Sequence, residues 1–326
     1  MFKPILEERQ PIVYKVLYNS LKHKQASHAY LFTGPKGSKK LDTARLFAQS
    51  LVCPNHSPFA CEECEICKRI EHNTFSDLIL LDGSLGSIKK DDVLKLQEAF
   101  SKTALETYGK KIYIVNEAEK ATEEALNSLL KFLEEPSGQD TYAILISEKP
   151  EALLETIISR CQTLSFKAQS QQALLKEIDP NSMDMYEAHL LSEMVNDSED
   201  MNALALDENF KHSLNMFGVF IYEYIKAPYL GEIFIQNHLL KKKEASVDRI
   251  RLHLFFQIGM LFFKDILFKT AFSSKVWKSR MNQIVHQIDP LKAFTLFNDN
   301  EAKISQNANL SLLIDALLFQ LKEGEK

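Results

Sequence analysis

Short apolar runs alternate with helical stretches through the first half of the chain, and this alternation limits the possible folds more than any other feature. The runs at residues 29–33, 78–81, 112–115, 142–146 and 162–166 have the length and composition of buried strands. Residues 39–52, 91–103 and 122–135 have helical patterns, the last of which stops before Pro136. Strands that alternate with helices predict an α/β layer with a mostly parallel sheet. Ligands in such folds bind beyond the carboxyl ends of the strands.

The second half of the chain has a different pattern, because no convincing strand follows residue 169. Short helices are expected at residues 174–178 and 185–195, with a turn at 179–181 between them and a polar break at 196–200 after them. Longer amphipathic helices are expected at residues 213–226, 246–272, 275–288 and 310–322. The sequence therefore predicts three domains: an α/β domain at 1–166, a small helical domain at 167–206 and a larger helical domain at 207–326.

Composition excludes several broad classes of protein. Of the 326 residues, 45% are hydrophobic and 25% charged, which is typical of soluble globular proteins and unlike disordered chains. The formal net charge of -5 gives no basic field over the whole protein, so any DNA contact is expected to be local or shared with partners. The most apolar stretch, residues 252–268, contains Lys264 and Asp265, which disfavour a membrane span. The N-terminal residues lack a signal-peptide core, so we expect a cytoplasmic protein with no membrane partner.

Four of the five cysteines lie close together in the sequence. Two residues separate Cys61 from Cys64, two separate Cys64 from Cys67, and seven separate Cys53 from Cys61. In a chain without an export signal, clustered thiols are typical of a metal site and not of disulfides. Four thiolates in a closed tetrahedron suit structural Zn²⁺ and leave no open position for a catalytic water. The alternative is a reduced loop without metal, whose exposed thiols would be prone to oxidation.

The loop after the first predicted strand matches part of a phosphate-binding sequence. The working pattern is G-x-x-x-x-G-K-[ST], in which backbone N–H groups surround the phosphates and the last hydroxyl holds Mg²⁺. Residues 34–41 read GPKGSKKL, which makes Gly34, Gly37 and Lys40 the candidate nucleotide-binding residues. Lys39 replaces the second glycine of the pattern, and Leu41, which cannot bind a metal, replaces the hydroxyl residue. A coincidental Gly-Pro turn is the alternative explanation.

Three further candidates lie where predicted strands end, at the same edge of the sheet as the loop. A working site needs Asp-Glu after the next strand, where Asp supports Mg²⁺ and Glu polarises water, but here Asn116-Glu117 follows it. Ser147 ends another strand. Because two metal-site positions are changed, we expect no ATP hydrolysis by this chain alone. Binding of a nucleotide or another anion by Lys40 and the helix N-terminus stays open.

Several segments together resemble the bacterial clamp loader subunits of the AAA+ class. They are residues 28–32 (HAYLF), the four-cysteine insertion, residues 125–136 (ALNSLLKFLEEP) and residues 159–161 (SRC). The resemblance is close from residue 10 to residue 166. It is thinner in the helical remainder, where residues 307–310 and the amphipathic helix after them are similar to a collar domain. The resemblance implies an AAA+ domain with a zinc-binding insertion, a helical lid domain and an all-α collar domain that joins subunits.

Arg160 is the candidate catalytic residue. It lies just before the last predicted strand, from where its guanidinium can point away from the domain. The resemblance implies that this arginine reaches ATP bound on a neighbouring motor subunit and acts as an arginine finger, stabilising charge on the phosphoryl oxygens. An ordinary surface arginine is the alternative. The resemblance also gives Ser147 the position of a polar nucleotide sensor, although a structural role fits equally well.

The changed loop and the intact Ser-Arg-Cys sequence together resemble a member of the family that does not hydrolyse ATP. The resemblance implies a rigid subunit in an assembly with gamma/tau motor subunits and a delta subunit. Such an assembly opens the sliding clamp (beta) and places it on primed DNA. One alternative is an ATP-hydrolysing motor subunit of the gamma/tau type. The other is a stand-alone zinc-dependent nucleic-acid-binding module, which would show a steep salt dependence of DNA binding.

Two remaining features have ordinary structural explanations. A lysine run at residues 241–243 is typical of a solvated helix end, although it could meet a phosphate backbone. Phe255, Phe256, Phe262 and Phe263 cover more than one face of their predicted helix, so we expect them to pack between helices and not to stack on bases.

Overall fold

The computed structural model describes residues 1–102, 104–106, 108–134, 140–178, 183–238, 245–304 and 308–322. It divides into two compact units, Met1–Gln169 and Ser170–Lys326. The expected turn at 179–181, the lysine run at 241–243, Pro136 and residue 307 lie outside the described residues. The expected end of the α/β domain, at residue 166, lies three residues before the end of the first unit, and the division of the helical part at 206/207 stays a prediction.

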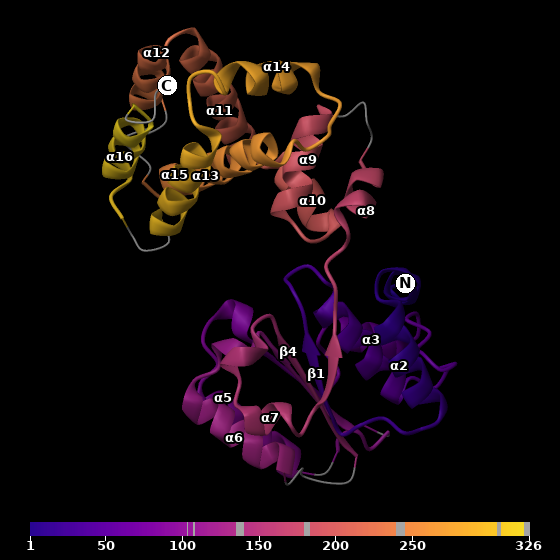
Figure 1. The fold of residues 1–326 in the computed structure, drawn as a ribbon. Helices are drawn as coiled ribbons and strands as arrows, with labels where there is room; N and C mark the ends of the chain where they lie inside the picture. Colours follow the sequence, from indigo (N-terminus) through magenta and orange to yellow (C-terminus); the bar gives the residue numbers. More distant parts are fainter. Residues whose placement is uncertain are drawn as a thin grey trace. The chain divides into compact units, whose positions relative to one another are not determined.

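The first unit contains a five-stranded sheet between two layers of helices (Figure 1). In sheet order, the strands are β2 (Leu78–Asp82), β3 (Lys111–Asn116), β4 (Thr141–Ser147), β1 (Ala29–Thr33) and β5 (Gln162–Ser165). Every neighbouring pair in this sheet is parallel. The predicted parallel α/β layer is therefore confirmed, and each predicted strand agrees with an observed one to within a residue at either end.

Helices α2 and α3 lie on one side of this sheet, and α5, α6 and α7 lie on the other (Figure 1). The helices of the unit are α1 (Lys3–Arg9), α2 (Pro11–Lys22), α3 (Lys40–Val52), α4 (Glu65–Glu71), α5 (Lys90–Ser101), α6 (Glu123–Glu134) and α7 (Glu155–Ile158). Three short 3-10 helices follow strands β2, β3 and β4, at Gly83–Leu85, Ala118–Lys120 and Pro150–Ala152.

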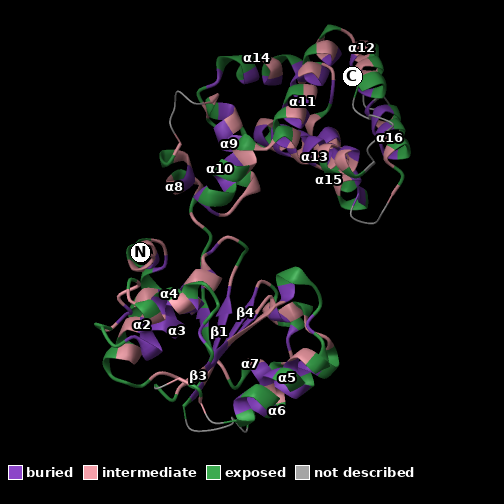
Figure 2. Ribbon diagram, turned by 180° about the vertical axis from the view of Figure 1, so that it is seen from behind, coloured by how far each residue is buried: buried purple, intermediate pink, exposed green. Residues whose placement is uncertain are grey.

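Alternate residues of the strands supply two separate hydrophobic cores. Tyr30 and Phe32 of β1 pack with Phe47 of α3 on one face, while Leu31 packs with Phe132 of α6 on the other. The central strands β1, β3 and β4 are buried along most of their length, and Figure 2 shows β1 and β4 buried and the outward faces of the helices exposed. Because both faces of the sheet are covered, the strands appear in the sequence as continuous apolar runs and not as alternating ones.

The described part of the second unit is entirely helical, as predicted. Its helices are α8 (Gln171–Lys176), α9 (Met185–Met194), α10 (Ser198–Leu206), α11 (Glu208–Lys226), α12 (Pro228–His238), α13 (Ala245–Phe268), α14 (Lys275–Ile284), α15 (Pro290–Ile304) and α16 (Leu310–Lys322). The expected polar break at 196–200 is correct at 196–197, which separate α9 from α10, and wrong at 198–200, where α10 begins. The Asp197 carboxylate accepts the N–H groups of Glu199 and Asp200, so this polar segment is a helix cap.

Helix α13 supplies much of the core of the second unit. Phe255, Phe256, Phe262 and Phe263 are all fully buried, which confirms that these rings pack between helices. Aromatic neighbours from other helices surround them. Phe297 of α15, for example, contacts three of these four rings, with centroids 5.6–6.0 Å apart.

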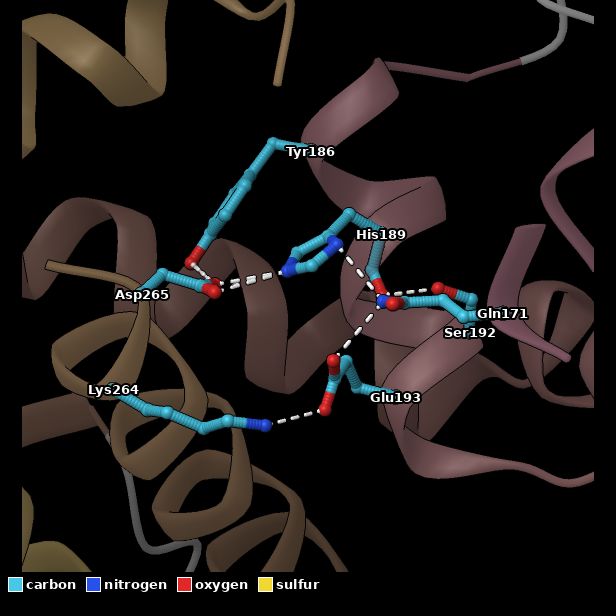
Figure 3. Close-up of polar contacts among 7 residues, drawn as sticks. All are labelled: Gln171, Tyr186, His189, Ser192, Glu193, Lys264 and Asp265. Atoms are coloured by element: carbon cyan, nitrogen blue, oxygen red, sulfur yellow. Dashed lines mark hydrogen bonds and ion pairs between the residues drawn. The ribbon is translucent and has the colours of Figure 1, made fainter. Parts of the chain in front are cut away.

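A chain of polar contacts joins α8, α9 and α13 (Figure 3). The buried Asp265 carboxylate accepts the Tyr186 hydroxyl at 3.0 Å and contacts Nε2 of His189 at 3.1 Å. Nε2 of Gln171 lies 3.1 Å from Nδ1 of His189 and donates to Glu193 at 3.0 Å. A flipped Gln171 amide would place its oxygen against the Glu193 carboxylate. Gln171 therefore donates to Nδ1, and the His189 proton lies on Nε2, facing Asp265.

No helix in the described ranges has both the length and the apolar character that crossing a membrane requires.

Candidate functional site

The parallel register brings the predicted nucleotide-site residues to one edge of the sheet. Thr33, which ends β1, is paired with Ser147, which ends β4. Asn116 ends β3 and is paired with Asp82 at the end of β2. The backbone N–H of Gly34 then donates to the Ser147 carbonyl at 3.3 Å. The loop, Asn116 and Ser147 therefore lie at the same edge of the sheet, as expected.

The Lys40 side chain is directed into its own loop. Its ammonium donates to the carbonyl oxygens of Gly34 at 2.7 Å and Pro35 at 2.6 Å, and to the Ser38 hydroxyl at 3.2 Å. Lys40 is only 6% exposed. Burial lowers the pKa of Lys40, an effect opposed by the nearby carboxylate of Glu148. The ammonium is fully hydrogen-bonded by loop atoms without any ligand.

The backbone of the loop nevertheless has the conformation that a glycine-rich sequence favours. Lys39, which replaces a glycine of the pattern, has a φ of 64° in the left-handed region, and Gly37 has a φ of 77°. Gly34 has a φ of 147°, and a Cβ there would lie 2.5 Å from the carbonyl oxygen of Phe166. Leu41 packs against the hydrophobic core. The loop therefore keeps its turn, but Leu41 stands at the position where a hydroxyl would hold Mg²⁺.

Gln10, which the sequence analysis did not single out, connects this loop to the segment after β5. Its Nε2 donates to the carbonyl of Ser38 at 3.3 Å and to that of Lys167 at 2.7 Å. Its Oε1 accepts the backbone N–H of Lys167 at 3.0 Å. No sequence signal marks these contacts, because the partners lie 28 and 157 residues away.

The other candidates at this edge are engaged within the chain as well. Asn116 donates through Nδ2 to Oδ1 of Asp82 at 2.8 Å. Glu117, which has a φ of 50°, forms an ion pair of 2.6 Å with Lys120. The fully buried Ser147 hydroxyl accepts the backbone N–H of Lys149 at 3.1 Å. These side chains hold the turns that follow the strands.

The four clustered cysteines converge in space between α3 and α4. The Sγ atoms of Cys53 and Cys61 are 3.6 Å apart, those of Cys53 and Cys64 are 3.9 Å apart, and those of Cys64 and Cys67 are 3.5 Å apart. All four lie within 4.8 Å of one another. Sulfur atoms that share one tetrahedral Zn²⁺ at ~2.3 Å lie ~3.8 Å apart. The geometry therefore fits four ligands of one metal ion.

The surroundings of one of these thiols favour metal binding, whereas burial raises the pKa of Cys53 and Cys67. Backbone hydrogen bonds from Glu63 and Cys64 lower the pKa of Cys61 to about 6, favouring the thiolate form that binds metals. Cys67 is fully buried. The carboxylate of Glu62 accepts the backbone N–H groups of Phe2 at 2.7 Å and Lys3 at 3.4 Å. The cysteine segment thus holds the start of α1.

Arg160 lies at the opposite edge of the sheet from the loop. It comes just before β5, whose first residue, Gln162, is paired with Tyr30 near the start of β1. A parallel strand of four residues spans ~13 Å, so Arg160 and the loop after β1 are at different ends of the strands. Its guanidinium donates to the Thr156 carbonyl at 2.9 Å and pairs with Glu134 at 2.5 Å.

Relatives of known identity match along most of this chain. A family model described as DNA polymerase III, delta subunit, matches residues 9–170. The delta' subunit of DNA polymerase III from Bacillus subtilis is 37% identical over 98% of this chain and 98% of its own length. The tau subunit from the same organism is 36% identical over 56% of this chain and 32% of its own. The tau/gamma subunit of Haemophilus influenzae is 34% identical over 56% of this chain and 25% of its own length.

The parallel α/β fold and these matches define a clamp loader subunit of the AAA+ class. Within that class, the 37% identity to a delta' subunit over 98% of both chains shows the family: the chain belongs to the delta-prime family of DNA polymerase III subunits.

Proposed function

We propose that this chain is the clamp loader subunit that does not hydrolyse ATP and serves as a rigid neighbour to the motor subunits. The proposal rests above all on the Lys40 ammonium, which is hydrogen-bonded to three acceptors of its own loop. A lysine in a working phosphate loop directs its charge to the nucleotide. Leu41 and Asn116 also stand where groups that hold Mg²⁺ are needed. Nucleotide binding by the loop is not part of the proposal.

Arg160 is the residue through which this subunit would act on a neighbour. It is too far along the sheet from its own loop to serve it, and its side chain is 37% exposed. Its contacts with Glu134 and the Thr156 carbonyl hold the guanidinium in a defined orientation. An arginine supplied in trans stabilises the charge that develops on the transferred phosphoryl group.

The remaining parts of the proposal concern the metal and the partners. Four thiolates in a closed tetrahedron fit structural Zn²⁺ with ligands Cys53, Cys61, Cys64 and Cys67. Relatives named as tau, tau/gamma and delta' subunits support an assembly with gamma/tau and delta subunits. That assembly would load the sliding clamp onto primed DNA in the cytoplasm.

The test is a loader reconstituted with this chain carrying Arg160→Ala. We expect normal assembly, while single-turnover phosphate release from the adjacent ATP slows by on the order of 10²-fold. Arg69→Ala is the matched control, because Arg69 is also a partly exposed arginine of the first unit paired with a carboxylate, that of Glu106 at 2.6 Å. The control loader should hydrolyse ATP at the wild-type rate.

Two results would contradict the proposal in different ways. Unchanged phosphate release from the Arg160→Ala loader would exclude the arginine finger. Turnover that depends on Mg²⁺ in the isolated wild-type chain would exclude the non-hydrolysing role and favour a motor subunit.

A further inference from the structure

A pocket in the second unit lies between the start of α9 and helices α11 and α14. Its volume is about 430 Å³, within the range of ligand-binding pockets. Ten residues line it, and they combine cations, carboxylates and apolar side chains: Asp184, Glu187, Lys211, Leu214, Asn215, Gly218, Val219, Val276, Trp277 and Arg280. Neither the nucleotide loop nor the cysteine cluster contributes to it.

Arg280 is the unusual member of this pocket. Its guanidinium lies over the ring of Trp277, with 4.8 Å between its central carbon and the ring centroid. Burial lowers the pKa of Arg280. Among the described residues, no carboxylate pairs with this guanidinium and no carbonyl accepts its N–H groups. A ligand carboxylate would give this guanidinium an acceptor in place of water.

Apolar side chains beside the guanidinium are accessible to such a ligand. A Cβ at Gly218 would lie 3.0 Å from a terminal nitrogen of Arg280, so glycine lets the guanidinium lie close to helix α11. Val276, on the same helix as Arg280, is 57% exposed, and Tyr222, on the neighbouring helix α11, is 51% exposed. Tryptophan, tyrosine and arginine are the residues that most often dominate binding energy at protein interfaces.

The opposite wall of the pocket is acidic. Burial, and then the charge of Asp184, raise the pKa of Glu187. Asp184 itself accepts the backbone N–H of Tyr186 at 2.8 Å. These two carboxylates offset the two cations of the lining, Lys211 and Arg280, so the pocket has no excess positive charge to attract a nucleic-acid backbone. A polypeptide, by contrast, can present a carboxylate to Arg280, an N–H or ammonium to Glu187, and apolar atoms to the rim.

We propose that this pocket binds a segment of a neighbouring protein that carries a carboxylate, with Arg280 as its anchor. The guanidinium, held over the ring of Trp277, accommodates the two carboxylate oxygens, and Glu187 accepts a hydrogen bond from the same segment. The identity of the neighbour rests on the proposed function: it is a motor subunit of the loader.

The experiment uses the only tryptophan of the chain, Trp277, as a reporter inside the pocket. The full chain labelled with 5-fluorotryptophan gives one ¹⁹F resonance, which is followed as the unlabelled gamma/tau subunit is added. We expect the resonance to shift on binding, and Arg280→Gln to weaken binding at least ~10-fold. Lys278→Gln removes a positive charge from the same helix, outside the pocket lining, and should change the affinity less than ~2-fold.

A second variant and a folding measurement keep the outcomes distinct. Arg280→Lys keeps the charge without the planar pair of donors, and should fall between wild type and Arg280→Gln in affinity. Urea unfolding of each variant identifies any that fail to fold. A complex that forms without moving the ¹⁹F resonance, or that binds Arg280→Gln as tightly as wild type, would overturn this proposal alone. Absence of any complex with the wild-type chain would overturn the proposed function together with it.

Discussion

Lys40 is nearly buried, and its ammonium has three acceptors from the loop that precedes it. A buried carbonyl that loses its donor costs about 1–3 kcal/mol. We therefore expect Lys40→Met to lower the free energy of unfolding by about 1–3 kcal/mol in the absence of nucleotide, measured by urea denaturation. The exposed Lys36 of the same loop is the control, and Lys36→Met should change the free energy of unfolding by less than about 0.5 kcal/mol. A Lys40→Met variant as stable as wild type would mean that the loop does not depend on this lysine.

Arg160 differs from Lys40 in what it contributes to the fold. Its ion pair with Glu134 joins side chains that are 37% and 42% exposed, and such pairs contribute ~0–1 kcal/mol. Loss of this arginine therefore has little effect on stability. A large change in ATP hydrolysis by the Arg160→Ala loader would then report on the neighbouring site and not on unfolding.

At the scale of elements, helices α9 and α13 are held together by the contact between His189 and Asp265. Asp265 is 4% exposed and His189 is 7% exposed. We expect His189→Phe to lower the free energy of unfolding of the second unit by about 1–3 kcal/mol, because both Asp265 and Gln171 lose a partner. Urea denaturation followed by Trp277 fluorescence measures this loss of stability, since the ring centroids of Trp277 and Tyr186 are 5.2 Å apart.

Lys264 and Glu193 provide the control for this prediction. They form an ion pair of 2.6 Å at the exposed end of the same chain of contacts, with side chains 36% and 25% exposed. Lys264→Gln should therefore cost less than about 1 kcal/mol. Equal effects of the two substitutions would contradict a special contribution of the buried pair.

The elements differ in how well the sequence predicts them. The central strands β1, β3 and β4 were predicted closely, because a run buried on both faces is visible in composition alone. Helices α1, α2, α4, α7, α10, α12 and α15 were not predicted. Three of these, α2, α12 and α15, begin with proline, a residue favoured at the first position of a helix, so a signal for their start was present. Helix α10 was missed because its capping aspartate, Asp197, reads as part of a polar loop.

At the scale of the whole molecule, metal removal should affect the two units differently. The cysteine cluster is the only group of potential metal ligands found among the described residues, and it lies in the first unit. We expect a strong chelator under reducing conditions to destabilise that unit by several kcal/mol, since ligand binding energy contributes directly to folding. Hydrogen exchange should rise at the start of α1, where Glu62 accepts two N–H groups. The Trp277 signal of the second unit should not change.

Two cysteine variants give the controls for metal removal. Cys64→Ser should abolish binding of one zinc per chain, whereas Cys161→Ser, which lies outside the cluster, should leave the metal content unchanged. Metal well below one ion per chain in wild-type protein purified with reductant would contradict the site.

The sequence alone determined the parallel sheet, the four metal-ligand candidates and the edge at which the phosphate-type loop lies. Each of these depends on residue type and short spacing, which local patterns record. Only the tertiary structure decided that Lys40 bonds its own loop, that Gln10 holds Lys167, and that Asp265 meets Tyr186 and His189. The last two sets of contacts join residues 157, 79 and 76 positions apart. Partners so distant are chosen by how the elements pack, and no local pattern contains that information.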